Sequence, residues 1–237
     1  MCGRYASSRQ PDELIDEFGV TLSKVDQPIG PDFNVAPTKP VYAVLERAAP
    51  DAEVSRQLRI LTWGLVPSWA KDPKIAGRMI NARMETLAQK PAFRRAFAAR
   101  RCLLPADGYF EWYPTGQTGP RGNPVKQPFF IRPRDSSVMA MAGLYELWKD
   151  PDSGVWRWTC TVITTDAEDS VGQIHDRMPL MVDRSRWDAW LDPAAPGSTD
   201  LLTPAAPGRL EAYPVSTLVS NVRNNGQDLI RPLEASR

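Results

Sequence analysis

The most regular pattern in the chain is the stretch Val155-Trp156-Arg157-Trp158-Thr159-Cys160-Thr161-Val162-Ile163. From its first tryptophan to its second valine, apolar side chains alternate with arginine and threonine. Successive side chains of a β-strand point to opposite faces, so a period of two predicts a strand with one face in an apolar core. The stretch therefore predicts that a sheet forms the centre of the fold.

The rest of the sequence supplies more strands and a few helices around this strand. Strands are predicted at Val41–Leu45, Leu58–Trp63, Phe129–Arg132 and Val138–Leu147. Helices are predicted over Pro11–Phe18, from Pro91 to about Arg101, and through Trp187 and Trp190. Many strands with few helices favour a single α+β domain over residues 1–237, built on a curved or barrel-like sheet.

Capping residues, prolines and glycines predict where these elements begin and end. Ser8 is expected to cap the first helix and Gly19 to end it, while Asp183 is expected to cap the last helix. Prolines and glycines predict a loop at Gly30–Pro40 and surface excursions at Thr115–Pro124 and Asp192–Gly208.

The composition of the 237-residue chain excludes several classes of protein. No apolar run approaches the ~18 residues of a membrane span, and no hydrophobic stretch near Met1 resembles a secretion signal. The formal net charge is +1, which excludes a strongly basic protein that coats nucleic acid. From Arg78 to Arg101, seven basic residues accompany one acidic residue, which suits a local phosphate-binding face or simply a solvated helix surface.

The cysteines and the histidine argue against a metal site or a disulfide framework. Cys2, Cys102 and Cys160 are far apart in the sequence, and His175 is the only histidine. Zinc sites usually combine several such ligands at short spacings, and disulfide frameworks use an even number of cysteines. We therefore expect no metal, no cofactor and a reducing, cytoplasmic environment.

Cys2 is the first candidate for covalent chemistry. Removal of Met1 would leave an α-amine and a thiol on one residue. An α-amine titrates near ~7.7–8.0 and a lysine near ~10.4, so at pH ~7.4 roughly a third of the α-amine is neutral, against roughly 0.1% of lysine. Such an amine can form an imine with an aldehyde, and the thiol can then close a five-membered thiazolidine ring. Position alone also suits an incidental residue on a frayed terminus.

A second candidate segment lies near residue 80. Asn81 and Arg83 follow a loop rich in tryptophan and proline that ends at Trp69. Aromatic rings stack on bases and arginine holds phosphate, so this segment suits a nucleotide site. The alternative is that the tryptophans are core residues and the polar side chains make local turn contacts.

Two more residues suit proton transfer. Glu111 lies between aromatic residues, where burial would raise its pKa and make it a general acid or base. An exposed edge-strand position would give it no such role. His175 lies beside Asp176 and Arg177 and could move protons near neutral pH, although a lone histidine is often structural.

Taken together, these segments resemble the SRAP family, the SOS response-associated peptidases, whose members sense abasic sites in DNA. The matching segments follow one another in order from Met1 to about Pro232. They are Met1–Tyr5, Phe33–Pro37, Trp63–Trp69, Asn81–Thr86, Arg101–Trp112, Ala142–Tyr145, Ile163–Thr165, Ile174–Pro179 and Val222–Gly226. The resemblance implies a single α+β domain around a pseudo-barrel mixed sheet with short peripheral helices.

The resemblance also implies a role for each matching residue. Cys2 would form the thiazolidine with the ring-opened sugar, and Asn81 would orient the Cys2 amine or the sugar. Glu111 would move protons and assist removal of Met1, while His175 would help to open the sugar. The residues expected to contact DNA are Arg4, Trp69, Arg83, Trp112 and, as a polar contact, Thr164. The implied partner is single-stranded DNA with abasic sites, bound by a monomer in the cytoplasm or nucleoid, with peptidase or lyase character.

Two other functions also fit parts of the sequence. Amidohydrolases with an N-terminal nucleophile also begin Met-Cys-Gly, but the downstream sequence shows no matching glutamine-binding motif. A noncatalytic module for single-stranded DNA would leave Cys2 incidental. Glutaminase activity would identify the first, and unchanged DNA behaviour of a Cys2→Ala variant would identify the second.

Overall fold

Strand β11 (Trp156–Asp166) lies at the centre of the larger sheet, as its alternation predicts. It pairs antiparallel with β10 (Met139–Lys149) and parallel with β5 (Val54–Trp63). From there β5 pairs with β4 (Pro40–Ala48), β4 with β7 (Arg101–Ala106), and β7 with β10. These pairings close a mixed, barrel-like ring of five strands.

The structure is a computed structural model that describes residues 2–48, 53–120, 122–167, 169–204 and 206–234, without the side chains of 169 and 170. Short elements complete the chain. They are β2 (Leu22–Ser23), β6 (Asn81–Arg83), β12 (Arg177–Pro179), α3 (Asp169–Gly172), and the 3-10 turns η1 (Pro73–Arg78), η2 (Arg184–Arg186), η3 (Thr199–Leu201), η4 (Thr217–Ser220) and η5 (Gln227–Ile230).

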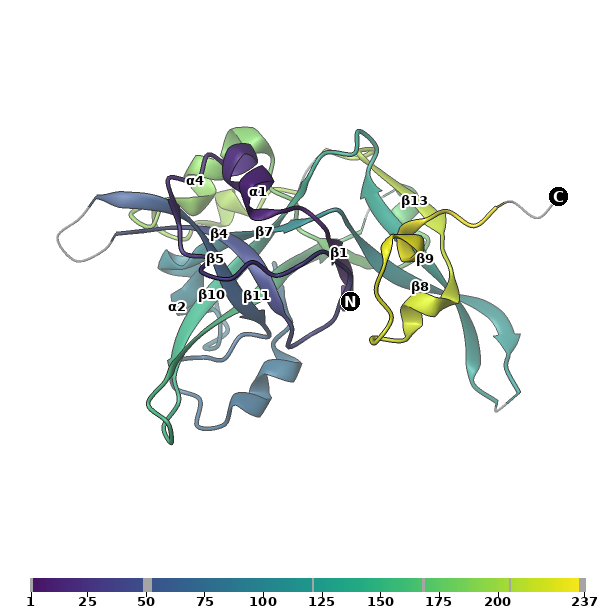
Figure 1. The fold of residues 1–237 in the computed structure, drawn as a ribbon, viewed down its shortest axis with the longest axis horizontal. Helices are drawn as coiled ribbons and strands as arrows, with labels where there is room; N and C mark the ends of the chain where they lie inside the picture. Colours follow the sequence, from purple (N-terminus) through teal and green to yellow (C-terminus); the bar gives the residue numbers. More distant parts are fainter. Residues whose placement is uncertain (1, 49–52, 121, 168, 205, 235–237) are drawn as a thin grey trace.

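The two faces of the ring have different partners. The inner face of β11 presents Cys160 and Val162 to a core that also contains Trp63 and Tyr145. The outer face presents Ile163 to a second core shared with the helices. Those helices are α1 (Pro11–Phe18), α2 (Arg94–Ala99) and α4 (Trp187–Leu191), which lie against the outside of the ring (Figure 1). Alternate residues of β11 therefore point into the barrel interior and toward the helices outside it.

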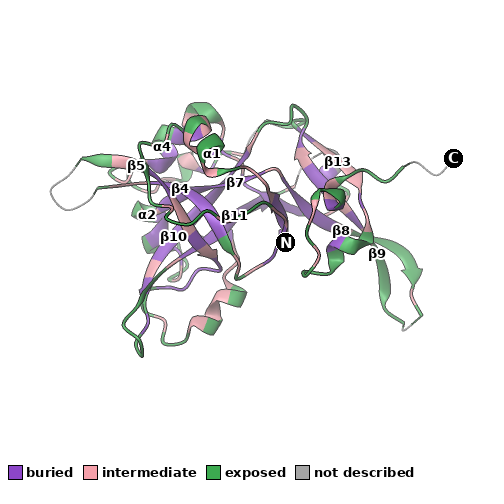
Figure 2. Cartoon of the chain, viewed as in Figure 1, coloured by how far each residue is buried: buried purple, intermediate pink, exposed green. Residues whose placement is uncertain are grey.

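A second sheet stands beside the ring. Its order is β13 (Leu210–Pro214), β9 (Pro124–Pro133), β8 (Gly108–Thr118), β1 (Tyr5–Ser7) and β3 (Asp32–Val35). The long β8–β9 hairpin extends away from the ring, and β1 runs between the two parts (Figure 1). Buried residues fill the sheets, while the hairpin tip is exposed (Figure 2). The N-terminal strand thus brings Cys2 to the junction of both sheets.

Several predicted boundaries are wrong for identifiable reasons. The helix after Pro91 covers only Arg94–Ala99, because β7 takes Arg101 into the sheet. Gln10, rather than Ser8, caps α1 through reciprocal bonds with Glu13. The Asp183 side chain makes no capping bond to η2, which precedes α4.

The predicted loops also contain regular structure. Gly30–Pro40 includes strand β3, which pairs with β1. Much of Thr115–Pro124 belongs to the β8–β9 hairpin, although it is exposed as expected. These segments form strands because they pair with other strands of the sheet. The positions of nearby prolines and glycines do not predict that pairing.

Arg101 is a buried cation held by backbone carbonyls. Its guanidinium donates to the carbonyls of Trp190, Phe97, Ala98, Asp192 and Ala195, with distances from 2.5 to 3.0 Å. These bonds satisfy all five donors of the side chain. They tie the ends of α2 and α4 to β7 and anchor the start of the Asp192–Gly208 excursion. Arg101 is therefore a structural residue, not part of a phosphate-binding face.

Gly108 offers a test of packing between β8 and β9. A Cβ there would lie 2.5 Å from the Ile131 carbonyl oxygen and 2.6 Å from Phe130 Cζ. We expect Gly108→Ala to lower the free energy of unfolding by about 1–3 kcal/mol, because the backbone must shift. Gly30→Ala is the control, since a Cβ there meets nothing within 4 Å. Equal urea midpoints for the two variants would contradict this prediction.

Among the described residues, no helix is both long enough and apolar enough to cross a bilayer.

Candidate functional site

Asn81 meets Cys2 because strand β6 pairs with β11. The register places Asn81 beside Val162, next to the core that contains Cys2. Asn81 Nδ2 donates a hydrogen bond of 2.8 Å to the Cys2 carbonyl oxygen. The amide therefore fixes the backbone of the cysteine, 79 residues away in sequence.

Glu111 and His175 meet beside the same cysteine. Glu111 is on β8 and is 4% exposed, while His175 lies in the turn between α3 and β12. Glu111 Oε2 is 4.0 Å from His175 Nε2. The charge of Glu111 also acts on the Cys2 thiol. The structure thus brings together all four residues expected to perform chemistry.

The environment of Glu111 suits proton transfer. Burial raises its pKa to about 7, so both protonation states are populated near neutral pH. An ordinary glutamate titrates near ~4.3 and is a poor proton donor at that pH. Shielding from water therefore gives this carboxyl the capacity to act as acid and as base.

His175 is assigned as a neutral ring. Burial lowers its pKa below the usual range. Its Nδ1 accepts a hydrogen bond of 3.0 Å from the Arg177 amide and also lies 2.9 Å from Asp176 Oδ1. The first contact requires a bare Nδ1 and the second a protonated one. Burial opposes the charged ring, so only one nitrogen carries a proton. We favour the first contact because the Arg177 amide hydrogen is fixed by the backbone, whereas the Asp176 carboxylate is 86% exposed and can turn to solvent. The proton then lies on Nε2, facing Glu111.

The Cys2 thiol is protonated at neutral pH. Burial, reinforced by the negative charge of Glu111, raises its pKa far above the usual range. Cys102 and Cys160 are also buried thiols. Burial raises the pKa of both, so neither offers a competing thiolate.

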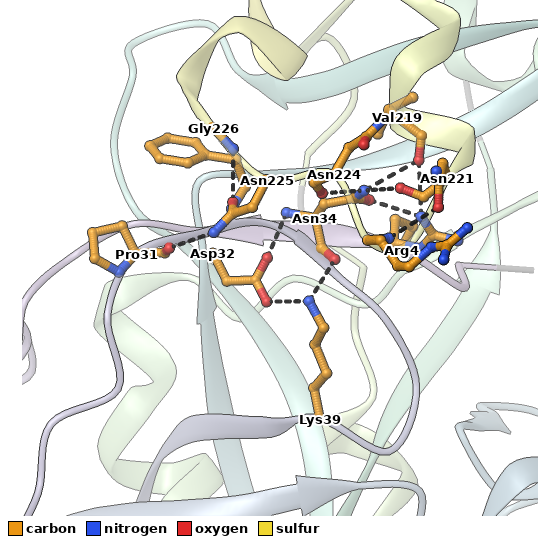
Figure 3. A network of polar contacts seen from close by, with 12 residues as sticks. Arg4, Pro31, Asp32, Asn34, Lys39, Val219, Asn221, Asn224, Asn225 and Gly226 are labelled. Carbon is orange, nitrogen blue, oxygen red and sulfur yellow. Dashed lines mark hydrogen bonds and ion pairs between the residues drawn. The ribbon is translucent and has the colours of Figure 1, made fainter.

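Arg4 is held in a polar network around Asn34 (Figure 3). Its Nη1 donates to Asn34 Oδ1 at 2.7 Å and to the Val219 carbonyl at 2.9 Å. The guanidinium also lies 5.6 Å from the ring centroid of Trp112. The guanidinium of Arg4 is therefore held in a fixed position.

Asn34 is a site residue that no local pattern predicts, although it lies in the matching segment Phe33–Pro37. The side chain is fully buried, and its Nδ2 faces the carbonyls of Val219, Asn221 and Asn224. Lys39 Nζ bonds the Asn34 carbonyl and forms an ion pair with Asp32 at 2.6 Å (Figure 3). This network joins the C-terminal turns to the strand that follows Cys2.

The aromatic residues expected to contact DNA differ in exposure. Trp69 is 57% exposed and borders a cavity of about 360 Å³ that is also lined by Lys71, Lys74 and Arg78. Trp112 is half-buried, and its Nε1 donates to Ser220 Oγ at 3.0 Å. Trp69 thus has a free ring face, whereas Trp112 is held in the protein.

Arg83 and Thr164 are neighbours in the β6–β11 register. Arg83 is exposed, but Thr164 is 1% exposed and its carbonyl accepts from Arg177. Arg177 also pairs with Glu85 and Asp166. Only Arg83 of this pair offers its side chain to solvent.

Lys126 is a further residue that sequence patterns did not reveal. Burial sets the direction of the pKa shifts of Glu111 and His175, and the Lys126 charge lowers both pKa values by a smaller amount. It lies opposite Pro114 on the exposed hairpin. The described residues contain no group of three or more histidines, cysteines or carboxylates suited to a metal.

Comparison with known proteins places this arrangement in a family. Residues 1–222 match the family described as SOS response associated peptidase (SRAP). The abasic site processing protein YoqW of Bacillus subtilis is 37% identical over 236 residues, covering 97% of this chain and 99% of YoqW. YedK of Escherichia coli, also named an abasic site processing protein, is 30% identical over 246 residues, covering 98% of this chain and all of YedK.

Relatives extend beyond bacteria, and the fold is also found in a solved structure. The abasic site processing protein HMCES of Xenopus tropicalis is 33% identical over 262 residues, covering 95% of this chain and 76% of HMCES. A crystal structure of a Bacteroides thetaiotaomicron protein has the same fold, with a TM-score of 0.82 at 24% identity, over 98% of this chain and all of that one. The chain belongs to the SOS response associated peptidase family.

Proposed function

We propose that this protein processes abasic sites in single-stranded DNA by bonding covalently to them through Cys2. The observation that carries the proposal is the convergence of Cys2, Asn81, Glu111 and His175 from four separate parts of the chain. Local structure does not require these residues to meet. The relatives named abasic site processing proteins support the choice of lesion.

The first step needs a free amine on Cys2, which removal of Met1 by hydrolysis would provide. An abasic sugar in its open form carries an aldehyde at C1′. The Cys2 nitrogen attacks C1′, and Glu111 carries one nitrogen proton to the new C1′ oxygen, which gives a carbinolamine. Glu111 then carries the remaining nitrogen proton to the hydroxyl, which leaves as water. An imine remains between the Cys2 nitrogen and C1′.

The second step closes the ring. Cys2 Sγ adds to C1′ of the imine, the thiol proton passes to the nitrogen, and a thiazolidine forms. A raised thiol pKa suits this order, because the thiol stays neutral until the imine is present. His175, with its proton on Nε2, can donate to the sugar oxygen when the ring opens. Asn81 holds the Cys2 carbonyl and so orients the nucleophile.

The surrounding surface would hold the strand. Arg83 and Trp69 are exposed, so they can contact phosphate and base directly. Arg4 and Trp112 would act from the fixed network around Asn34. Thr164 is excluded from direct contact in this conformation by its burial.

Intact mass spectrometry tests the proposal. The protein should gain the mass of an abasic oligonucleotide minus one water, because aldehyde and aminothiol condense with loss of one water. An undamaged oligonucleotide of the same length is the control. Glutaminase activity without any DNA adduct would instead support the amidohydrolase function.

Strand context should matter strongly. Stacking on Trp69 requires unpaired bases, and a net charge of +1 gives little general attraction to duplex. We expect an abasic site in a single strand to react at least tenfold faster than the same site in a duplex, measured on denaturing gels at one salt concentration. Equal rates would argue against this account of recognition.

A further inference from the structure

A second cavity lies beside Glu111 and His175, and its lining carries no charge. It has a volume of about 300 Å³ and is lined by Tyr113, Phe129, Gln173, Ile174 and Ala212. Strands β8, β9 and β13 provide three of these residues, and the segment between α3 and β12 provides the other two. The cavity is called the neighbour pocket below.

Strand register makes the neighbour pocket continuous with the reactive site. Tyr113 follows Glu111 by two positions on β8, so both side chains point to the same face of the sheet. Phe129 is the direct partner of Glu111 across the β8–β9 hairpin, which places it on that face as well. Ile174 immediately precedes His175. The pocket and the site therefore share a floor on one sheet and a wall in one turn.

The chemistry of the neighbour pocket suits a flat, uncharged ring. Tyr113 is 44% exposed, and its ring meets Phe129 edge-on, with centroids 6.4 Å apart at 80°. This arrangement leaves aromatic surface open to a ligand. Gln173 is an exposed amide that can both donate and accept hydrogen bonds.

The Gln173 amide and the aromatic rings of Tyr113 and Phe129 line one pocket. A planar aromatic ring with a polar edge suits this lining, and a nucleobase is such a ring. The lesion itself has no base, so a base in this pocket must belong to an adjoining nucleotide.

We propose that the neighbour pocket binds the nucleobase next to the abasic sugar and thereby sets the position of that sugar at Cys2. The inference rests on the proposed function, because it assumes that the sugar is bound at Glu111 and His175. Stacking on the Tyr113 ring provides most of the binding, and the Gln173 amide contacts the edge of the base. An abasic site whose neighbour also lacks a base would lose this contact.

The test compares two single strands that differ only at the position next to the abasic site. One strand has a normal nucleotide there, and the other has a tetrahydrofuran spacer, which lacks a base. Each side of the lesion is tested separately, and adduct formation is timed on denaturing gels. Stacking of one base is worth ~1–3 kcal/mol, so on one side the spacer should slow the wild-type protein about tenfold. Tyr113→Ala should treat both strands alike, at about the rate of the wild type on the spacer strand. Tyr113→Phe keeps the ring and should restore the preference.

The control is Trp156→Ala, which removes another aromatic residue, 58% exposed, from the opposite end of β11. It should keep the wild-type preference for a neighbouring base. Equal wild-type rates with and without either neighbouring base would overturn the neighbour pocket and leave the proposed function intact. A full tenfold preference in the Tyr113→Ala protein would overturn the pocket as well. No adduct with any abasic strand would overturn the proposed function, and the pocket with it.

Discussion

Replacing Cys2 by alanine is expected to abolish the heat-stable DNA adduct. Alanine keeps an α-amine after Met1 is removed, so an imine can still form, but no sulfur is present to close the thiazolidine. Imines hydrolyse readily, whereas the five-membered ring should survive heating. The measurement is a denaturing gel of protein and abasic oligonucleotide after heating, with at least a hundredfold less adduct expected.

Two further variants show whether the loss is specific to the Cys2 thiol. Cys102→Ala removes another buried thiol from the same core and should form the adduct normally. Cys2→Ser should form a weaker adduct, because a hydroxyl closes a less stable ring. Full-strength adduct from Cys2→Ala would show that another residue reacts with the lesion.

Replacing Glu111 by glutamine should slow adduct formation by about 10²–10⁴-fold, the usual contribution of a general acid or base. Glutamine preserves the shape of the side chain and cannot transfer a proton. Wild-type rates should be highest near pH 7, where burial places the pKa of Glu111. The variant should lose that dependence, which single-turnover rates from pH 5 to 9 would reveal. An unchanged rate and profile would remove Glu111 from the mechanism.

The same substitution should stabilise the fold at alkaline pH. The folded-state pKa of Glu111 is about 7, above its unfolded value near ~4.3. The folded state therefore binds more protons between these values, and wild-type stability falls as pH rises through that window. The loss can reach about 4 kcal/mol. The free energy of unfolding of Glu111→Gln, measured in urea and compared with wild type, should therefore be more favourable at pH 8 than at pH 5. If the difference between variant and wild type is the same at both pH values, wild-type stability is not lowered by a buried, ionised carboxylate.

Alternation and helix punctuation predicted the elements that depend on local sequence. β11 follows directly from its period of two, and α1 begins and ends at the residues that the pattern predicted. The barrel-like ring was also expected, although no local pattern specifies its closure. That closure depends on the parallel pairing of β11 with β5, a contact between residues nearly a hundred positions apart.

Other features could not be predicted because they depend on tertiary contacts. Arg101 was expected in a basic helix, but it is buried by carbonyls from two other segments. Asn34 gains its importance from turns near residue 220, which no local pattern connects to it. Tyr113 is an ordinary hairpin residue until the β8–β9 register places it on the same face as Glu111 and Phe129. Residue types with intrinsic reactivity were recognisable, and residues that act through position were not.

The solitary histidine provides a spectroscopic probe that most active sites lack. Because His175 is the only imidazole in the chain, its ring C–H resonances in a proton NMR spectrum need no assignment by mutagenesis. The ring is 4.0 Å from Glu111, so its chemical shift should record the ionisation of that carboxyl as well as its own. A titration of one resonance would therefore follow both partners at the reactive centre, provided that the protein is purified without a polyhistidine tag.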